Sequence, residues 1–312
     1  MSSSSVPLST PEGPGSVSGA PNLPAGFTDT FTSRYIDTGE LRQHAVIGGD
    51  GPPLLLVHGW PETWYAWRLP MPALARDFEV IAVDQRGIGL TDKPEDGYDS
   101  ATLAGDLVAL MDALGHQRFA VVGHDTGYII GYALAADHPH RVDRVALVEI
   151  PGPPMASASP PLFVPRAAQQ QALAHPLQPG RRGARTAGQG TGGPPSSGYE
   201  FAIRTGNGRK LPDDVVDHYV RILSDPAALR GCFGLYRAWD TTAAQNEQRA
   251  PRPLTMPVLA IGGAASWGER VGNVAANDVQ TVVIPGTGHW VAETAPEEML
   301  AALAPFLAPY RS

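Results

Sequence analysis

The feature that most constrains the fold is the Val-Val-Gly-His-Asp-Thr-Gly run at 121–127, which passes into small and apolar residues at 128–134. A β-branched strand, a turn flanked by glycines and a helix of small residues form the context of a nucleophile elbow, with Asp125 at the apex. The glycines let strand and helix approach where a Cβ would clash. A carboxylate there can attack an sp3 carbon and form an ester with it. An ordinary strand-to-helix connection with Asp125 as N-cap is the alternative.

Apolar segments of strand length alternate with helical periodicity along the chain. Leucine and methionine recur at helical spacing over 103–114, and another helix is expected from Pro296. Strands alternating with helices predict an α/β fold with a mostly parallel sheet covered on both faces. Besides the strand before Asp125, strands are expected over 31–35, 42–47, 53–57, 78–83, 144–148, 256–261 and 279–284.

The alternation is interrupted after the strand that ends at Glu149 and resumes near residue 252. An insertion there would lie over the carboxyl edge of the sheet, where ligands of open α/β sheets bind. We therefore expect a core formed by 27–152 and 252–312, with a helical cap at 153–251. Residues 1–26 are rich in Ser, Pro and Gly and are expected to form a disordered tail.

Composition excludes several classes of partner. A net charge of −8 argues against nucleic acid and against an anionic membrane surface, since both call for clustered Lys and Arg. No apolar run is long enough to span a bilayer, and the first residues lack the pattern of a secretory signal, so the cytoplasm is the expected location. Cys232 is the only cysteine, which excludes an intrachain disulfide and favours a buried packing role. The oligomeric state stays open, with a homodimer as one assembly that the sequence allows.

Further motifs surround the elbow in a fixed order. The chain carries His-Gly-Trp-Pro at 58–61 and Gly-Thr-Gly-His-Trp at 286–290. With these motifs the sequence resembles the α/β-hydrolases, in the branch with an Asp nucleophile that holds epoxide hydrolases and dehalogenases. The resemblance covers 27–165 and 198–312, and it implies an α/β-hydrolase core with a helical cap and with no metal or organic cofactor.

The resemblance also implies roles for individual residues. Asp125 would be the nucleophile and His289 the general base, since neutral imidazole can take a proton from water near pH 7, as ester hydrolysis requires. The backbone N–H groups of Trp60 and Thr126 would form the oxyanion hole. His289 needs a carboxylate to orient it, and the loop at 262–266, where many relatives place that acid, has none. Glu149 occupies the other position that relatives use, with a surface glutamate at a strand end as the alternative.

The residues around the nucleophile distinguish between branches of the family. Thr126 is neither the Arg of fluoroacetate dehalogenases nor the Trp of typical haloalkane dehalogenases, and Trp60 stands where the latter carry Asn. Epoxide opening needs an acid at the ring oxygen, and Gly-Leu-Tyr-Arg-Ala at 234–238 resembles the cap helix that supplies it. The resemblance thus implies Tyr236 as that acid, with ordinary cap packing as the alternative. The usual second residue, a Tyr or the His of a Trp-His pair, is not evident.

Residues 166–197 differ in composition from the rest of the expected cap, being rich in Gly, Pro, Gln and Arg and lacking aromatic residues. A disordered linker is one interpretation. A compensated reading-frame shift in the source gene is another. Codons that can encode 164–182 yield, after loss of one base, an amphipathic segment that contains a Trp-His pair.

The sequence therefore predicts an epoxide hydrolase that acts on a small-molecule epoxide. Asp125 would form an alkyl-enzyme ester, and hydrolysis of that ester would release a diol. Two alternatives stay open. Halide release would indicate a haloalkane-type dehalogenase, and epoxide binding without diol release would indicate a weakly catalytic or non-catalytic scaffold.

Overall fold

The computed structural model describes residues 9–152 and 210–311 of the chain. The first residues of the predicted tail and the first part of the predicted cap lie outside these ranges. The unusual segment 166–197, with its two interpretations, is therefore outside the described residues.

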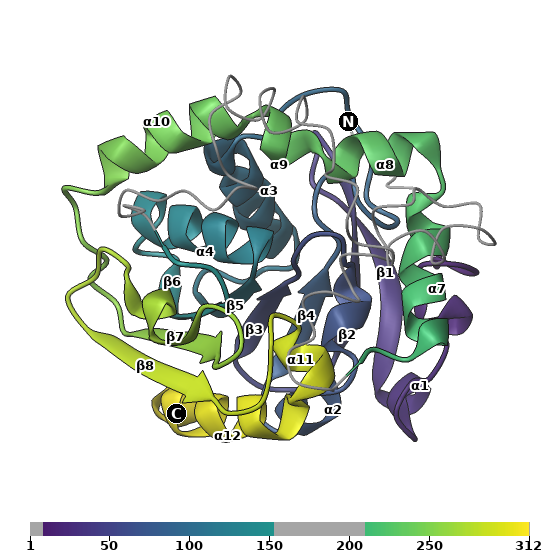
Figure 1. Cartoon of the computed structure of the whole chain (residues 1–312). Helices are drawn as coiled ribbons and strands as arrows, with labels where there is room; N and C mark the ends of the chain where they lie inside the picture. Colours follow the sequence, from purple (N-terminus) through teal and green to yellow (C-terminus); the bar gives the residue numbers. More distant parts are fainter. Residues whose placement is uncertain (1–8, 153–209, 312) are drawn as a thin grey trace, which may run out of the picture.

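The strands of the described ranges form one eight-stranded sheet in the order β1-β2-β4-β3-β5-β6-β7-β8 (Figure 1). β2 pairs antiparallel with β1 and with β4, and all other neighbours are parallel. This arrangement confirms the predicted mostly parallel α/β fold. The strands are β1 (Phe31–Asp37), β2 (Arg42–Gly48), β3 (Pro53–Val57), β4 (Glu79–Val83), β5 (Phe119–His124), β6 (Val142–Val148), β7 (Val258–Gly263) and β8 (Val279–Ile284).

Helices cover both faces of the sheet, and a further group of helices crosses one edge (Figure 1). None of the helices in the described ranges is long and apolar enough to cross a membrane. The α-helices are α1 (Phe27–Thr30), α2 (Met71–Leu74), α3 (Ser100–Ala113), α4 (Thr126–Asp137), α7 (Asp213–Leu223), α8 (Pro226–Cys232), α9 (Gly234–Arg237), α10 (Trp239–Arg249), α11 (Val291–Thr294) and α12 (Pro296–Leu307). The 3-10 helices are η1 (Val17–Gly19), η2 (Trp64–Trp67), η3 (Gly268–Gly272) and η4 (Ala308–Tyr310).

The continuous apolar strands supply two cores, one on each face of the sheet. In β3, Leu54 and Leu56 pack in the core with α2, η2 and α12, whereas Leu55 and Val57 pack in the core with α3 and α4. Side chains of a strand alternate between faces, so an all-apolar strand must be buried on both. The central strands therefore hold their carboxyl ends in fixed positions.

The prediction of a disordered tail is wrong for residues 9–26. Val17 is buried in the core, and its N–H donates to Ser33 Oγ at 2.9 Å. The carbonyl oxygen of Gly15 accepts from Trp64 Nε1 at 2.7 Å. The prediction failed because this segment is fixed mainly by its backbone carbonyl oxygens, and the amino-acid composition gives no sign of such contacts. Those acceptors satisfy donors that would otherwise be buried without a partner.

The described part of the cap consists of α7 to α10, which arch over the sheet in Figure 1. α10 is held to the core by an ion pair of the buried Arg249 with Asp137 in α4. α8 lies directly on the loop after β4, where a Cβ on Gly231 would come within 2.2 Å of the Gly87 carbonyl oxygen. The cap therefore rests on backbone as well as on side chains. The bounds 153–251 for the cap stay a prediction.

Candidate active site

The turn after β5 has the geometry of an elbow. Asp125 has φ 52° and ψ −112°, a backbone conformation that is costly for a residue with a Cβ. A Cβ on Gly123 would lie 2.1 Å from the Gly127 carbonyl oxygen, and one on Gly127 would lie 2.2 Å from that of Val57. An ordinary N-cap residue has an extended backbone. The backbone of Asp125 therefore does not fit the alternative of an ordinary strand-to-helix connection with Asp125 as N-cap.

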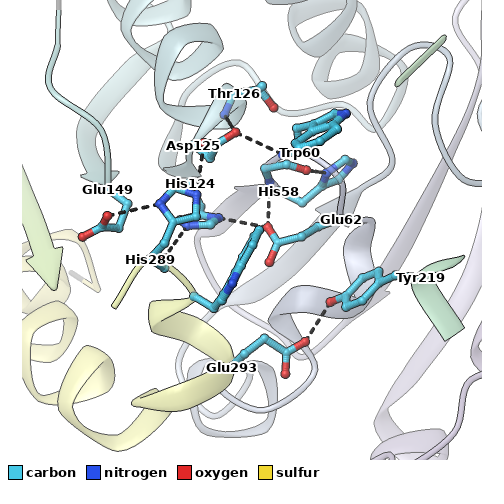
Figure 2. A network of polar contacts seen from close by, with 12 residues as sticks. His58, Trp60, Glu62, His124, Asp125, Thr126, Glu149, Tyr219, His289 and Glu293 are labelled. Carbon is cyan, nitrogen blue, oxygen red and sulfur yellow. Dashed lines mark hydrogen bonds and ion pairs between the residues drawn. The ribbon is translucent and has the colours of Figure 1, made fainter. Parts of the chain in front are cut away.

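The carboxylate of Asp125 is buried and held by two backbone donors (Figure 2). Oδ1 accepts from Trp60 N at 3.1 Å and from Thr126 N at 2.7 Å. These are the two N–H groups predicted for the oxyanion hole. They converge on one oxygen and leave Oδ2 on the side of His289.

The structure brings the three predicted triad residues together. His289 Nε2 lies 3.1 Å from Asp125 Oδ2, and His289 Nδ1 lies 3.2 Å from Glu149 Oε2. Glu149 is fully buried at the end of β6, and its Oε1 accepts from the backbone N–H of Gly263. The alternative of a surface glutamate is therefore excluded by burial, and the two oxygens of Glu149 face two different partners.

The two carboxylates change the protonation of the histidine. Burial alone lowers the pKa of His289, but hydrogen bonds and charges of Asp125 and Glu149 outweigh burial and raise that pKa to about 9. In the resting site the imidazole is thus protonated at pH 7. The neutral imidazole predicted for the general base belongs to the later step of ester hydrolysis and stays a prediction.

The turn that carries Trp60 is fixed by a neutral histidine. Burial lowers the pKa of His58, and its Nε2 accepts from the N–H of Gln85 at 3.2 Å. Its Nδ1 lies 2.8 Å from the Gly59 carbonyl oxygen, so the ring proton must be on Nδ1. His58 therefore ties this turn to the loop after β4.

Sequence reasoning gave no role to Glu62 and His124, which form a buried pair behind the triad (Figure 2). Glu62 Oε2 lies 2.9 Å from His124 Nδ1 and accepts from Gly59 N at 3.0 Å. His124 Nε2 lies 2.9 Å from the His289 carbonyl oxygen. The pair thus joins the turn of Trp60, the nucleophile strand and the loop of the base. The sequence signal available for this pair was a polar residue at each of two motifs, Glu62 directly after His-Gly-Trp-Pro and His124 directly before Asp125.

The cap contributes aromatic rings that contact the indole of Trp60. Tyr236 lies in α9, with its ring centroid 5.7 Å from that of Trp60. Cys232 is buried against the same indole, which confirms its predicted packing role, and burial raises its pKa to about 12. Within the described ranges, no group of three or more His, Cys, Asp or Glu could hold a metal ion.

Comparisons with known proteins show the family to which the chain belongs. The model of the alpha/beta hydrolase fold family matches residues 52–296. A soluble epoxide hydrolase of a Corynebacterium species is 31% identical over 86% of this chain and 95% of that protein. A fluoroacetate dehalogenase of a Burkholderia species is 30% identical over 90% of this chain and 95% of that protein. The crystal structure of epoxide hydrolase A from Mycobacterium thermoresistibile superposes with a TM-score of 0.72 at 28% identity, covering 89% of this chain and 98% of that one. The chain belongs to the alpha/beta hydrolase fold family, in the branch that holds epoxide hydrolases.

Proposed function

We propose that this chain hydrolyses epoxides to diols through an alkyl-enzyme ester on Asp125. The observation that carries the proposal is that the two carboxylate oxygens of Asp125 have different partners. Oδ1 is held by two backbone donors, whereas Oδ2 faces the imidazole of His289. Relatives named as epoxide hydrolases support the same reaction. The homodimer and the cytoplasmic location stay predictions of the sequence.

Ring opening is the first step. Asp125 Oδ2 attacks one epoxide carbon, a C–O bond forms, and the bond from that carbon to the ring oxygen breaks. The ring oxygen takes the proton of the Tyr236 hydroxyl, leaving a tyrosinate. Oδ1 becomes the carbonyl oxygen of the ester and keeps its contacts with the N–H groups of Trp60 and Thr126.

Ester hydrolysis is the second step. His289 takes a proton from water, and the hydroxide attacks the ester carbon of Asp125. The negative charge develops on Oδ1, where two N–H groups already point. Collapse breaks the bond between the ester carbon and the alkoxide oxygen, and that oxygen takes the remaining proton of the attacking hydroxide, so the diol leaves and Asp125 is a carboxylate again. The proton that His289 holds in the resting site passes to the Tyr236 tyrosinate before hydrolysis, and the proton taken from water replaces it on His289, so the net reaction adds one water to one epoxide.

Alkylation itself prepares His289 to act as a base. In the resting site, hydrogen bonds and charge from two carboxylates raise the pKa of His289 to about 9 against the effect of burial. Ester formation removes the charge of Asp125, whereas burial and Glu149 are unchanged. The pKa of His289 must then fall, and the imidazole can give up its proton before it activates water.

A dehalogenase is the second candidate, since a fluoroacetate dehalogenase is 30% identical to this chain. Displacement of halide would use the same attack by Asp125 and the same ester. The two functions differ in the leaving group, because halide needs a cradle of donors and an epoxide oxygen needs a proton donor. Tyr236, beside Trp60, favours the epoxide.

Mass spectrometry of the intact protein tests the mechanism. Asp125→Ala should form no diol and no adduct with any epoxide. His289→Gln should be alkylated but not turned over, because attack needs only the carboxylate and hydrolysis needs activated water. A mass increase of one substrate should therefore accumulate in the His289 variant.

Two outcomes would contradict the proposal. Folded His289→Gln protein that never gains a substrate mass would exclude the covalent ester. Halide release from a haloalkane by the unmodified chain, without diol formation from epoxides, would favour the dehalogenase.

A further inference from the structure

Three aromatic rings form a continuous surface beside the oxyanion turn. The ring centroid of Trp60 lies 5.6 Å from that of Phe233 and 5.7 Å from that of Tyr236. Phe233 and Tyr236 lie 6.3 Å apart. Each ring is thus in contact distance of the other two, and we call these three side chains the aromatic wall.

The aromatic wall starts at the reacting carboxylate. The backbone N–H of Trp60 donates to Asp125 Oδ1, and the indole of the same residue contacts the two cap rings. Tyr236, which contacts the indole edge-on at 81°, is the proposed proton donor to the epoxide oxygen. The aromatic wall therefore adjoins the turn whose backbone N–H holds the reacting carboxylate.

The wall is held in place from behind. Trp60 packs against Leu223 and Cys232, which are 1% and 4% exposed. The close contact of Gly231 with Gly87 fixes α8 on the core, and a Cβ on Gly234 would lie 2.2 Å from the ring of Tyr98. A rigid backing means that little ordering is required when a ligand binds to the wall.

Phe233 is the ring of the wall that stays open. At 37% it is the exposed large hydrophobic side chain of the described ranges, whereas Trp60 is 8% exposed. A single exposed apolar residue is ordinary, but this one contacts the buried ring of Trp60, whose backbone N–H donates to the nucleophile. A flat apolar group on the substrate would cover it.

We infer that the site prefers epoxides with an aryl substituent and that Phe233 is a specificity-determining residue for them. The inference rests on the proposed epoxide hydrolase function. An aryl ring packs edge-on or offset against the aromatic wall, and such pairs gain more than their buried area alone supplies. A saturated ring of the same size gains the area without that directional part.

Two epoxides of nearly equal size test the inference in the full chain. We compare kcat/KM for phenyloxirane and cyclohexyloxirane in the unmodified protein, in Phe233→Leu and in Phe233→Tyr. The unmodified protein should favour the phenyl compound by about tenfold, the upper end of what one aromatic contact contributes. Phe233→Leu should lose most of this preference by lowering kcat/KM for the phenyl compound alone. Phe233→Tyr retains the ring and should retain the preference, and thermal melts establish that each variant is folded.

The outcomes separate the inference from the function on which it rests. Diol formation from both epoxides with equal kcat/KM would overturn the aryl preference and leave the proposed function intact. Equal loss on both substrates in Phe233→Leu would overturn the role of Phe233. No diol from either epoxide, together with no adduct in His289→Gln, would overturn both the function and the inference.

Discussion

The two sides of the candidate site are built differently. On the core side, Asp125, His289 and Glu149 are held atom by atom through hydrogen bonds and ion pairs between buried groups. On the cap side, Tyr236 and Phe233 are held by ring contacts and by the close approach of Gly231 to Gly87. The contacts on the core side are directional, whereas those on the cap side depend mainly on how well apolar groups fit together.

This difference corresponds to two chemical tasks. Bond making at Asp125 needs donors and charges within a fraction of an ångström, which only directional polar contacts supply. Choice of substrate needs a surface of suitable shape, which apolar packing supplies. Changes on the core side should therefore alter the rate of a particular step, whereas changes on the cap side should alter ring opening or substrate preference.

Glu149→Gln should have the largest effect among the single changes that retain the nucleophile and the base. An amide has one acceptor oxygen, so it cannot accept from both Gly263 N and His289 Nδ1 as the carboxylate does. It also cannot stabilise the imidazolium. We expect ester hydrolysis to slow by about 10³-fold and ester formation to slow much less. Single-turnover kinetics separate the two steps, and equal slowing of both would assign the orienting role to another acid.

Tyr236→Phe should slow ring opening by about 10²-fold, the lower end of the usual contribution of one general acid. The ring and its contact with Trp60 remain, so stability should not change. Tyr98→Phe is the matched control, because it removes a hydroxyl that donates to the Pro94 carbonyl oxygen at the same junction of cap and core. Rapid-quench measurement of adduct formation should distinguish the two variants. Equal rates would mean that another group protonates the epoxide.

Glu62→Gln should lower the free energy of unfolding by about 1.5 to 3 kcal/mol, the usual contribution of a hydrogen bond to a charged group. The Glu62 and His124 side chains are only 2% and 4% exposed. Glu79 and His116 form a matched pair at 3.0 Å whose side chains are 27% and 19% exposed. Glu79→Gln should therefore cost less than about 1 kcal/mol. Urea titration of both variants checks this contrast, and equal losses would show that burial of the pair is unimportant.

The smallest expected effect is a shift in the pKa of His289 when Asp125 is replaced by Asn. Its pKa of about 9 lies above the ordinary 6.5, so its contribution to stability is complete below about pH 6.5 and is lost as the pH rises through 9. In Asp125→Asn one of the two carboxylates is gone, so the pKa should fall. NMR titration of the imidazole in both proteins measures the difference. Titration near 9 in the variant would show that Asp125 does not set the protonation of the base.

Much of the core side could be predicted because its residues belong to local motifs. The glycines around Asp125 and the apolar strands leave their pattern in neighbouring residues, and the structure agrees with that pattern. The roles of Asp125, His289 and Glu149 stay predictions, although the three side chains meet. Glu62 and His124 were missed because nothing in either motif says that the two residues face each other across 62 positions.

The sequence by itself determined the strands, the elbow and the residue types that stand at the carboxyl edge of the sheet, since hydrophobic period and glycine positions are local properties. Only the tertiary structure decided which of these groups touch. Trp60 and Asp125 are 65 positions apart, and Glu149 and His289 are 140 apart. Charge, protonation and burial depend on distances between such segments, and so do the shape of the aromatic wall and the ordering of residues 9–26. A hydrogen bond or a pKa exists only once the chain has brought two distant groups together and removed the water between them.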